Sequence, residues 1–153
     1  MSVEDITLQE GMQAQEVQDD ILYLLLSQSP LKQALRGGGE IRKGKRSDRK
    51  EFAKQEDCTI GSLSSGAASV QLGTSNVNIY IPDRPSVATG SNAQGYEKDT
   101  ERIKEIKAIA YPVLKKYYCE RGWSFECVEQ GTLEEADLHC HRVWFKIRFV
   151  FHN

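Results

Sequence analysis

Apolar residues recur at helical spacing in two segments of the chain, residues 14–28 and residues 100–118. Asp99 precedes the second segment, where its side chain can accept hydrogen bonds from the first free helical amides. Pro112 removes one backbone hydrogen bond, so we expect either a kink or packing that offsets the loss. The apolar stripes consist of Val17, Ile21, Leu24 and Leu25 in the first segment and Ile103, Ile106, Ala110, Val113, Leu114 and Tyr117 in the second.

Strict alternation of apolar and polar residues predicts strands in four further segments. These segments are residues 58–63, 77–81, 123–127 and 141–151. The last one is the most regular, with Val143, Phe145, Ile147, Phe149 and Phe151 on one face and Arg142, Trp144, Lys146 and Arg148 on the other. A slip of one residue would bury three cations, so the register of this strand is well specified.

The order of these segments predicts an α+β fold with a mostly antiparallel sheet of about four strands and two main helices packed on one face. The chain has 153 residues, a length that suits one domain with one sizeable core. We expect residues 1–13 to form an acidic N-terminal extension and residues 14–153 to form a single domain. Gly37-Gly38-Gly39 predicts a chain reversal, and residues 131–137 predict an acidic turn.

Residues 82–98 are poor in apolar side chains and contain Pro85, Gly90 and Gly95. A long loop inside a small domain usually has a function, so this segment is the best candidate for an arm that contacts another molecule.

Charge is unevenly distributed, although the formal net charge is only −2. Residues 1–20 hold six acids and no Lys or Arg, whereas residues 42–50 hold six cations and one acid. An acidic segment and a basic segment of this kind could meet between subunits. No aromatic residue lies in 42–50 for bases to stack on, so a solvated loop is the simpler interpretation of that stretch.

The sequence shows no sign of secretion or of a membrane-spanning helix. Its longest apolar run, residues 21–26, is far shorter than the roughly 20 residues that cross a bilayer, and its N-terminus is acidic. The cysteines lack the density of an extracellular disulfide scaffold, so we expect reduced thiols in a cytoplasmic setting. They are Cys58, Cys119, Cys127 and Cys140.

The passage His139-Cys140-His141 is the one most suggestive of chemistry, because these residue types bind zinc. Structural zinc sites usually take ligands in closely spaced pairs, and the separation of Cys119 and Cys127 falls outside that pattern. Two histidines on one strand face would allow only a loose site. No thiol has an activating cluster in the sequence, and the glycine run lacks the lysine of a phosphate-binding loop. We therefore expect no metal, no cofactor and no enzymatic activity.

Element order and one strand-loop-helix passage carry a resemblance to a known family. The passages are a strand beginning at Glu56-Asp57-Cys58, the run Val77-Asn78-Ile79-Tyr80-Ile81-Pro82-Asp83, the helix start Asp99-Thr100-Glu101-Arg102 and the closing strand 143–151. In this arrangement residues 14–153 resemble the bacteriophage tail-completion or tail-terminator proteins of long-tailed phages and prophages. The chain departs from that pattern in its acidic N-terminal residues, its glycine run and its cysteines.

The resemblance implies a structural protein of virion assembly without an active site. Such proteins form a homo-oligomeric ring, commonly a hexamer, at the head-proximal end of the tail after assembly in the host cytoplasm. The ring ends growth of the tail tube and docks the tail to head-completion proteins. Two alternatives remain: a neighbouring head-tail connector, and a nucleic-acid-binding module that uses the basic 42–50 loop.

Three surfaces are the expected subunit or partner interfaces. Their residues are Arg42, Lys43, Lys45 and Arg46 in the basic stretch, Asp83, Arg84 and Tyr96 in the 82–98 loop, and Arg142, Trp144, Lys146 and Arg148 on the final strand. An exposed Trp flanked by Arg is typical of an interface hot spot. Alternatively, the first helix or residues 1–13 could cover Trp144.

Overall fold

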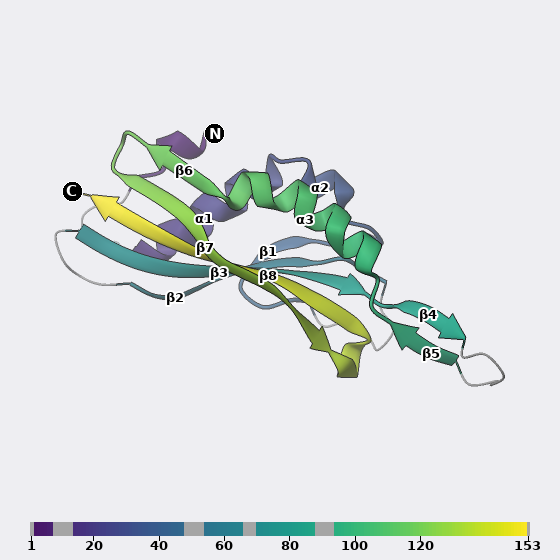
Figure 1. The fold of residues 1–153 in the computed structure, drawn as a ribbon. Coiled ribbons are helices and arrows are strands. Elements are labelled where there is room, and N and C mark those ends of the chain that lie inside the picture. The colour runs from purple at the N-terminus through teal and green to yellow at the C-terminus, as the bar shows by residue number, and fades with distance from the viewer. Residues whose placement is uncertain (1, 8–13, 48–53, 66–69, 88–93, 153) are drawn as a thin grey trace.

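The computed structural model describes residues 2–7, 14–47, 54–65, 70–87 and 94–152 (Figure 1). Its helices are α1 (Ala14–Ser27), α2 (Leu31–Ala34) and α3 (Thr100–Leu114), with 3-10 turns η1 (Val3–Asp5) and η2 (Ala136–Leu138). Its strands are β1 (Ile41–Lys43), β2 (Cys58–Ser65), β3 (Val70–Pro82), β4 (Arg84–Val87), β5 (Gln94–Glu97), β6 (Lys116–Cys119), β7 (Trp123–Glu135) and β8 (Cys140–His152).

The main sheet has six strands in the order β1-β2-β3-β8-β7-β6, and β4 pairs with β5 in a separate two-stranded sheet. Strand β1 runs parallel to β2, whereas every other pairing is antiparallel. The expected sheet of about four mostly antiparallel strands is therefore wrong, because the observed sheet is mixed, curled and larger. Two of the strands that the prediction missed, β1 and β6, are short edge strands.

Strands β3 and β8 form the centre of the sheet and pair without a break from Val70–His152 to Pro82–Cys140. The alternation in 141–151 predicted this strand correctly. Its apolar face is fully buried, as are Val77, Ile79 and Ile81 of β3. Cross-strand pairs of these side chains form the floor of the core, since residues directly opposite each other lie in contact.

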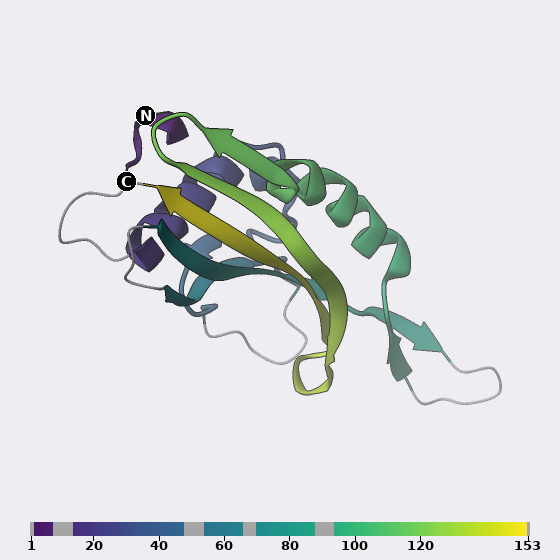
Figure 2. The same ribbon diagram turned by 60° about the vertical axis from the view of Figure 1, so that its left-hand side comes forward.

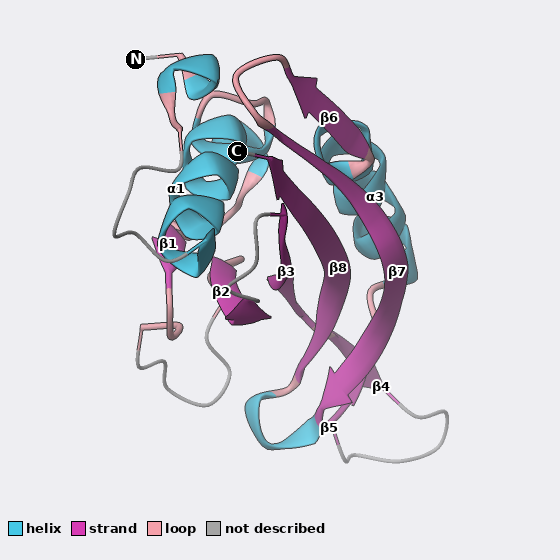
Figure 3. Cartoon of the chain, turned by 90° about the vertical axis from the view of Figure 1, so that its left-hand side faces the viewer, coloured by secondary structure: helices cyan, strands magenta, loops and turns pink. Residues whose placement is uncertain are grey.

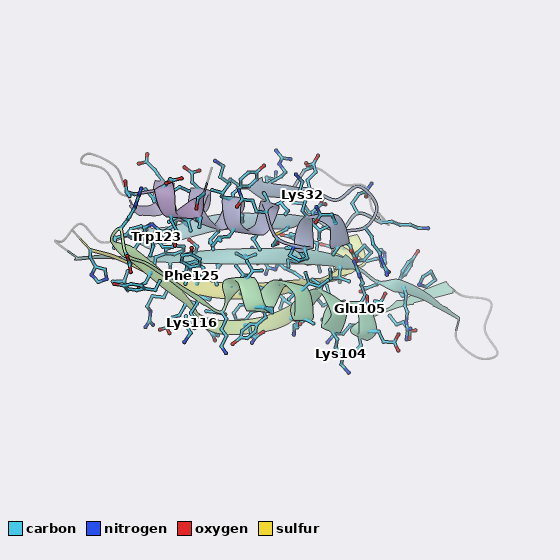
Figure 4. All side chains as sticks on the ribbon, turned by 90° about the horizontal axis from the view of Figure 1, so that it is seen from above. Lys32, Lys104, Glu105, Lys116, Trp123 and Phe125 are labelled. Carbon is cyan, nitrogen blue, oxygen red and sulfur yellow. The ribbon has the colours of Figure 1, made fainter. Side chains whose placement is uncertain are left out.

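Helices α1 and α3 lie on the same face of the sheet (Figures 3 and 4). Helix α1 packs on β1, β2 and β3, whereas α3 packs on β8 and β6, and each helix contacts the sheet more than it contacts the other helix. Ile21, Leu22 and Leu26 of α1 are fully buried against this floor. The other face of the sheet carries no described helix, and we call it the open face.

The predicted helix 100–118 ends early, at Leu114, and Pro112 lies in its last turn. Residues 116–119 form β6 instead, with Tyr117 stacked on Trp123 and Phe125. The predicted acidic turn at 131–137 is also wrong in its first part, because β7 continues to Glu135. Residues 82–98 hold the β4–β5 hairpin in place of the expected loop.

The acidic N-terminal segment contacts the domain through residues 2–7. Trp123 donates its indole N–H to the Ile6 carbonyl at 2.8 Å, and the Val3 side chain is buried in the core. Because Trp123 faces the helix side of the sheet, neither these residues nor α1 cover Trp144 on the open face. Residues 8–13 lie outside the described part of the chain.

Candidate assembly interface

The open face is built from side chains that stand in register across β3, β8 and β7. Asn78 pairs with Trp144, and Trp144 pairs with Gly131 on its other side. A Cβ atom built at Gly131 would lie 2.7 Å from Cζ2 and 2.9 Å from Cε2 of Trp144. The indole therefore lies against the backbone of β7 at Gly131, an approach that only a residue without a side chain permits.

Cations flank Trp144 along β8, in three different environments. Arg142 Nε forms an ion pair with the Glu135 carboxylate at 3.3 Å. This nitrogen is buried, and the ion pair does not have the geometry of a hydrogen bond. Lys146 is half-buried, and Arg148 is exposed. The structure thus brings the four predicted residues of the final strand together on one uncovered surface.

A groove of about 570 Å³ lies where the open face meets the edge strand β6. Two cross-strand rows run through it, Lys116–Glu126–Arg148 and Tyr118–Ser124–Val150. Tyr118 is 74% exposed, the largest exposed fraction among the described large hydrophobic side chains. The groove is lined by Lys116, Tyr117, Tyr118, Ser124, Phe125, Glu126, Arg148 and Val150.

The β4–β5 hairpin projects from the domain, and we call it the arm (Figures 1 and 2). Apart from their mutual pairing, its two strands make few contacts with other helices and strands. Its base is fixed by Asp83, whose carboxylate lies 2.6 Å from Nδ1 of His141 and whose amide donates to the His139 carbonyl at 2.9 Å. Tyr96 packs on the His139 ring, with the ring centres 4.1 Å apart.

The arm carries one ion pair of its own, between Arg84 and Glu97 at 2.7 Å. Both side chains are about half exposed, at 54% and 48%. The predicted interface residues of the 82–98 loop thus divide into two groups. Asp83 and Tyr96 contact the histidines next to the base of the arm, whereas Arg84 forms its ion pair within the arm.

The basic stretch is engaged within the chain. Lys43 forms an ion pair with Asp20 at 2.7 Å, so the acidic and basic segments meet inside one subunit. Arg46 is nearly buried, bonded to Asp57 at 2.8 Å and stacked 4.4 Å over the Tyr80 ring. Arg42 lies 3.9 Å from Glu40, and Lys45 is exposed. Residues 48–50 lie outside the described part.

The cysteines and histidines do not assemble a metal centre among the described residues. The four thiols are free. Burial raises the pKa of Cys58 to about 12 and, to a smaller extent, also raises the pKa of Cys127 and Cys140. His139 has left-handed backbone torsions (φ 50°) before β8 begins, so the expected shared strand face of His139 and His141 is not formed.

Comparisons with known proteins identify no relative among families or curated proteins, since the chain matches no family model and no curated protein. Within the described ranges, no helix is both long and apolar enough to cross a membrane.

Gly131 and the edge residues Lys116 and Tyr118 escaped the sequence analysis. Gly131 gave no direct signal, because a glycine beside an acidic stretch predicts a turn and not a strand position that contacts Trp144. A signal for β6 did exist. Aromatic residues followed by Arg121-Gly122 and then by the alternating 123–127 segment are typical of a hairpin.

Proposed function

We propose that this protein is a structural subunit of phage or prophage virion assembly that forms a closed ring, like the tail terminators it resembles. In this role it ends growth of the tail tube and offers a docking surface to head-completion proteins. Its working parts are contact surfaces and not a catalytic centre.

The observation that carries the proposal is the arm. An isolated two-stranded hairpin is marginally stable in water, and this one makes few contacts with the rest of its own chain. A second molecule that packs against it would supply the missing contacts. A contact between unlike surfaces of identical subunits generates a ring when its rotation closes.

The open face supports the same role. Trp144 lies between flanking cations on a surface that no described helix covers. Aromatic and Arg side chains supply most hot spots of protein interfaces. The face also holds the acids Glu126, Glu129 and Glu135 in register with Arg148, Lys146 and Cys140. Such mixed charge favours a specific protein partner over a polyanion.

The test is the solution mass of the purified chain by light scattering across a concentration series, repeated at high salt. We expect a ring-sized particle, or a mass that climbs toward one with concentration. Trp144→Ala and Arg148→Glu should each lower that mass while the subunits stay folded by circular dichroism. Lys104→Glu is the matched control, because Lys104 lies on α3, on the helix side of the sheet (Figure 4).

A wild-type mass in both open-face variants would exclude that face as an interface. A strict monomer at every concentration would argue against a self-assembling ring, and would favour a connector that assembles only on its partner.

A nucleic-acid-binding function is less well supported, because Lys43 and Arg46 are neutralised by acids of the same chain. Any DNA binding by this protein should be weak and should vanish between low and physiological salt.

A further inference from the structure

Strand β6 has a free edge. The Cys127 amide of β7 donates at 2.8 Å to the carbonyl of Lys115, the residue just before β6, so this carbonyl points toward β7. Because backbone groups of successive strand residues point to alternate sides, the N–H and C=O groups of Lys116 and Tyr118 point away from β7. No described residue supplies a hydrogen bond to these groups.

The free edge lies beside the groove, so a strand added to β6 would also cover part of the groove wall. Lys116 and Tyr118 belong to both features, because their side chains line the groove and their backbone groups form the edge. Unpaired strand edges readily take up a strand from another molecule, and natural proteins usually protect them. This edge has no described cover.

The arm is the matching element on the same chain. Strands β4 and β5 span four residues each, as β6 does, and each has only one described neighbour. The arm is therefore a second pair of free strand edges, of a length suited to the β6 edge.

Helix α3 keeps the arm and the β6 edge apart. It begins three residues after β5 and ends two residues before β6. Its 15 residues span about 22 Å at the usual rise of about 1.5 Å per residue. The arm and β6 consequently lie at opposite ends of the molecule, and Figure 4 shows Lys116 at the end away from the hairpin. An arm cannot reach the edge of its own subunit, whereas it can reach the edge of a neighbour.

Charge also suits this contact. The row Lys116–Glu126–Arg148 alternates in sign toward the edge and ends on a cation. An acid on an added strand would continue the alternation, and opposite charges on neighbouring strands attract each other. Glu97, half exposed on β5, is such an acid.

We propose that the β6 edge of one subunit receives the arm of the next copy by strand addition, a recognition mode in which main-chain hydrogen bonds supply affinity. This inference rests on the proposed ring and names the contact that builds it. Each subunit gives an arm at one end and accepts one at the other. The contact therefore propagates from copy to copy until the ring closes.

Two variants separate the halves of this contact. In the armless variant, Asn-Gly replaces residues 85–96, because Arg84 and Glu97 are register partners and Asn-Gly suits a two-residue hairpin turn. In the edge variant, Tyr118→Pro removes an N–H that points away from β7, so the β6–β7 ladder keeps its hydrogen bonds. Tyr118→Thr is the matched control, since it removes the ring but keeps that N–H.

We expect the armless variant and Tyr118→Pro to stay monomeric alone at concentrations where the wild type assembles. Mixed in equal amounts, they should form a particle of two chains and no larger, because one intact arm meets one intact edge. The mixture also controls for folding, since a misfolded variant could not complement the other. Tyr118→Thr should retain assembly above the level of Tyr118→Pro.

Wild-type assembly by both variants would overturn this contact and leave the proposed ring standing on other surfaces. A mixture that stays monomeric while the wild type assembles would overturn it as well. A wild-type chain that is monomeric at every concentration would remove the contact and the self-assembled ring together.

Discussion

Gln18 and Asp19 place polar groups between α1 and the sheet, where the rest of the interface is apolar. Gln18 donates to the Ser75 hydroxyl at 2.7 Å, and Asp19 accepts from the Ser62 hydroxyl at 2.7 Å. Gly73 makes room for the Gln18 amide, because a Cβ there would lie 2.0 Å from its Oε1. The helix is thereby fixed in one register along β2 and β3.

Asp19 should make stability depend on pH. Burial is the largest effect on this carboxyl and raises its pKa above the ordinary 3.8, with the hydrogen bond from Ser62 opposing. Since ionisation is harder in the folded chain than in the unfolded one, Asp19 favours folding when protonated. That contribution is lost as pH rises from about 3.8 through the raised pKa.

Asp19→Asn should therefore raise the free energy of unfolding at pH 7, by less than about 1 kcal/mol because the site is partly exposed. The gain should vanish near pH 3, where Asp19 is protonated in both states. Urea unfolding at the two pH values measures it. Asp20→Asn is the comparison variant. It breaks the surface pair with Lys43 and removes a neighbouring charge that is a smaller cause of the raised Asp19 pKa, so its gain at pH 7 should be smaller. A loss of stability at pH 7 in Asp19→Asn would contradict this account.

At the scale of elements, one buried ion pair joins three segments of the chain. Arg102, in the first turn of α3, donates from Nε and from an η nitrogen to the two Glu56 carboxylate oxygens, at 2.8 and 2.7 Å. Glu56 precedes β2 and also accepts the Arg36 amide at 2.9 Å. Arg102 reaches the Ala34 carbonyl at the end of α2 as well. Glu56 holds the pKa of Arg102 above its usual range.

Removing the cation should be costly because it leaves the Glu56 carboxylate buried without a cationic partner. We expect Arg102→Met to lower the free energy of unfolding by about 3–5 kcal/mol. Glu105→Ala, which removes an exposed carboxylate shared by Arg102 and Arg36, should cost less than about 1 kcal/mol. Denaturant titration measures both.

Adding Glu56→Gln to Arg102→Met should restore part of the loss, because the unpaired charge is removed. If the double variant is no more stable than Arg102→Met alone, desolvation of Glu56 is not the cause.

The elements that the sequence predicted are those with a strong apolar pattern. Helix α1, the body of α3 and strand β8 each bury an uninterrupted apolar stripe, so the sequence of each element follows a single helical or strand periodicity throughout. The apolar spacing predicts helix through β6, because Tyr117 continues the spacing of Leu114 and Ala110. Two of the four side chains of β6 are exposed, so its place at the sheet edge depends on pairing with β7, which local spacing does not encode.

The candidate site was predictable in part for the same reason. The face with Arg142 and Trp144 follows directly from alternation along β8. The groove and the contact of Trp144 with Gly131 depend on which strands become neighbours. Likewise, nothing in the basic stretch indicates that Arg46 would be buried against Asp57, because that contact forms only once β2 and the preceding loop are in place.

At the scale of the whole molecule, the reactivity of each thiol depends on how much of the fold must unfold before a reagent can reach it. Cys58 is buried in the core of β2, and its pKa of about 12 leaves almost no thiolate at pH 8. Cys127 lies at the register shift of β7 and is partly exposed. Alkylation of Cys58 therefore requires unfolding of the core, whereas alkylation of Cys127 does not.

Alkylation of the native protein at pH 8 should modify Cys127 well before Cys58. The rate at Cys58 should rise with urea in step with global unfolding, whereas the rate at Cys127 should hardly change below the transition. Mass spectrometry of digests follows both sites. Early modification of Cys58 without urea would show that the sheet opens locally at β2.

Strand β8 has one more consequence, for how the chain folds. Within the described sheet it alone connects β1, β2 and β3 to β7 and β6. It follows β7 in a hairpin, whereas every one of its pairs with β3 joins residues far apart in the sequence. Such topology slows folding, because loop closure precedes the gain from contacts. Before β8 pairs with β3, these two strands present two additional unpaired edges to other chains. Pairing of β8 with β3 is thus the event that separates productive folding from aggregation.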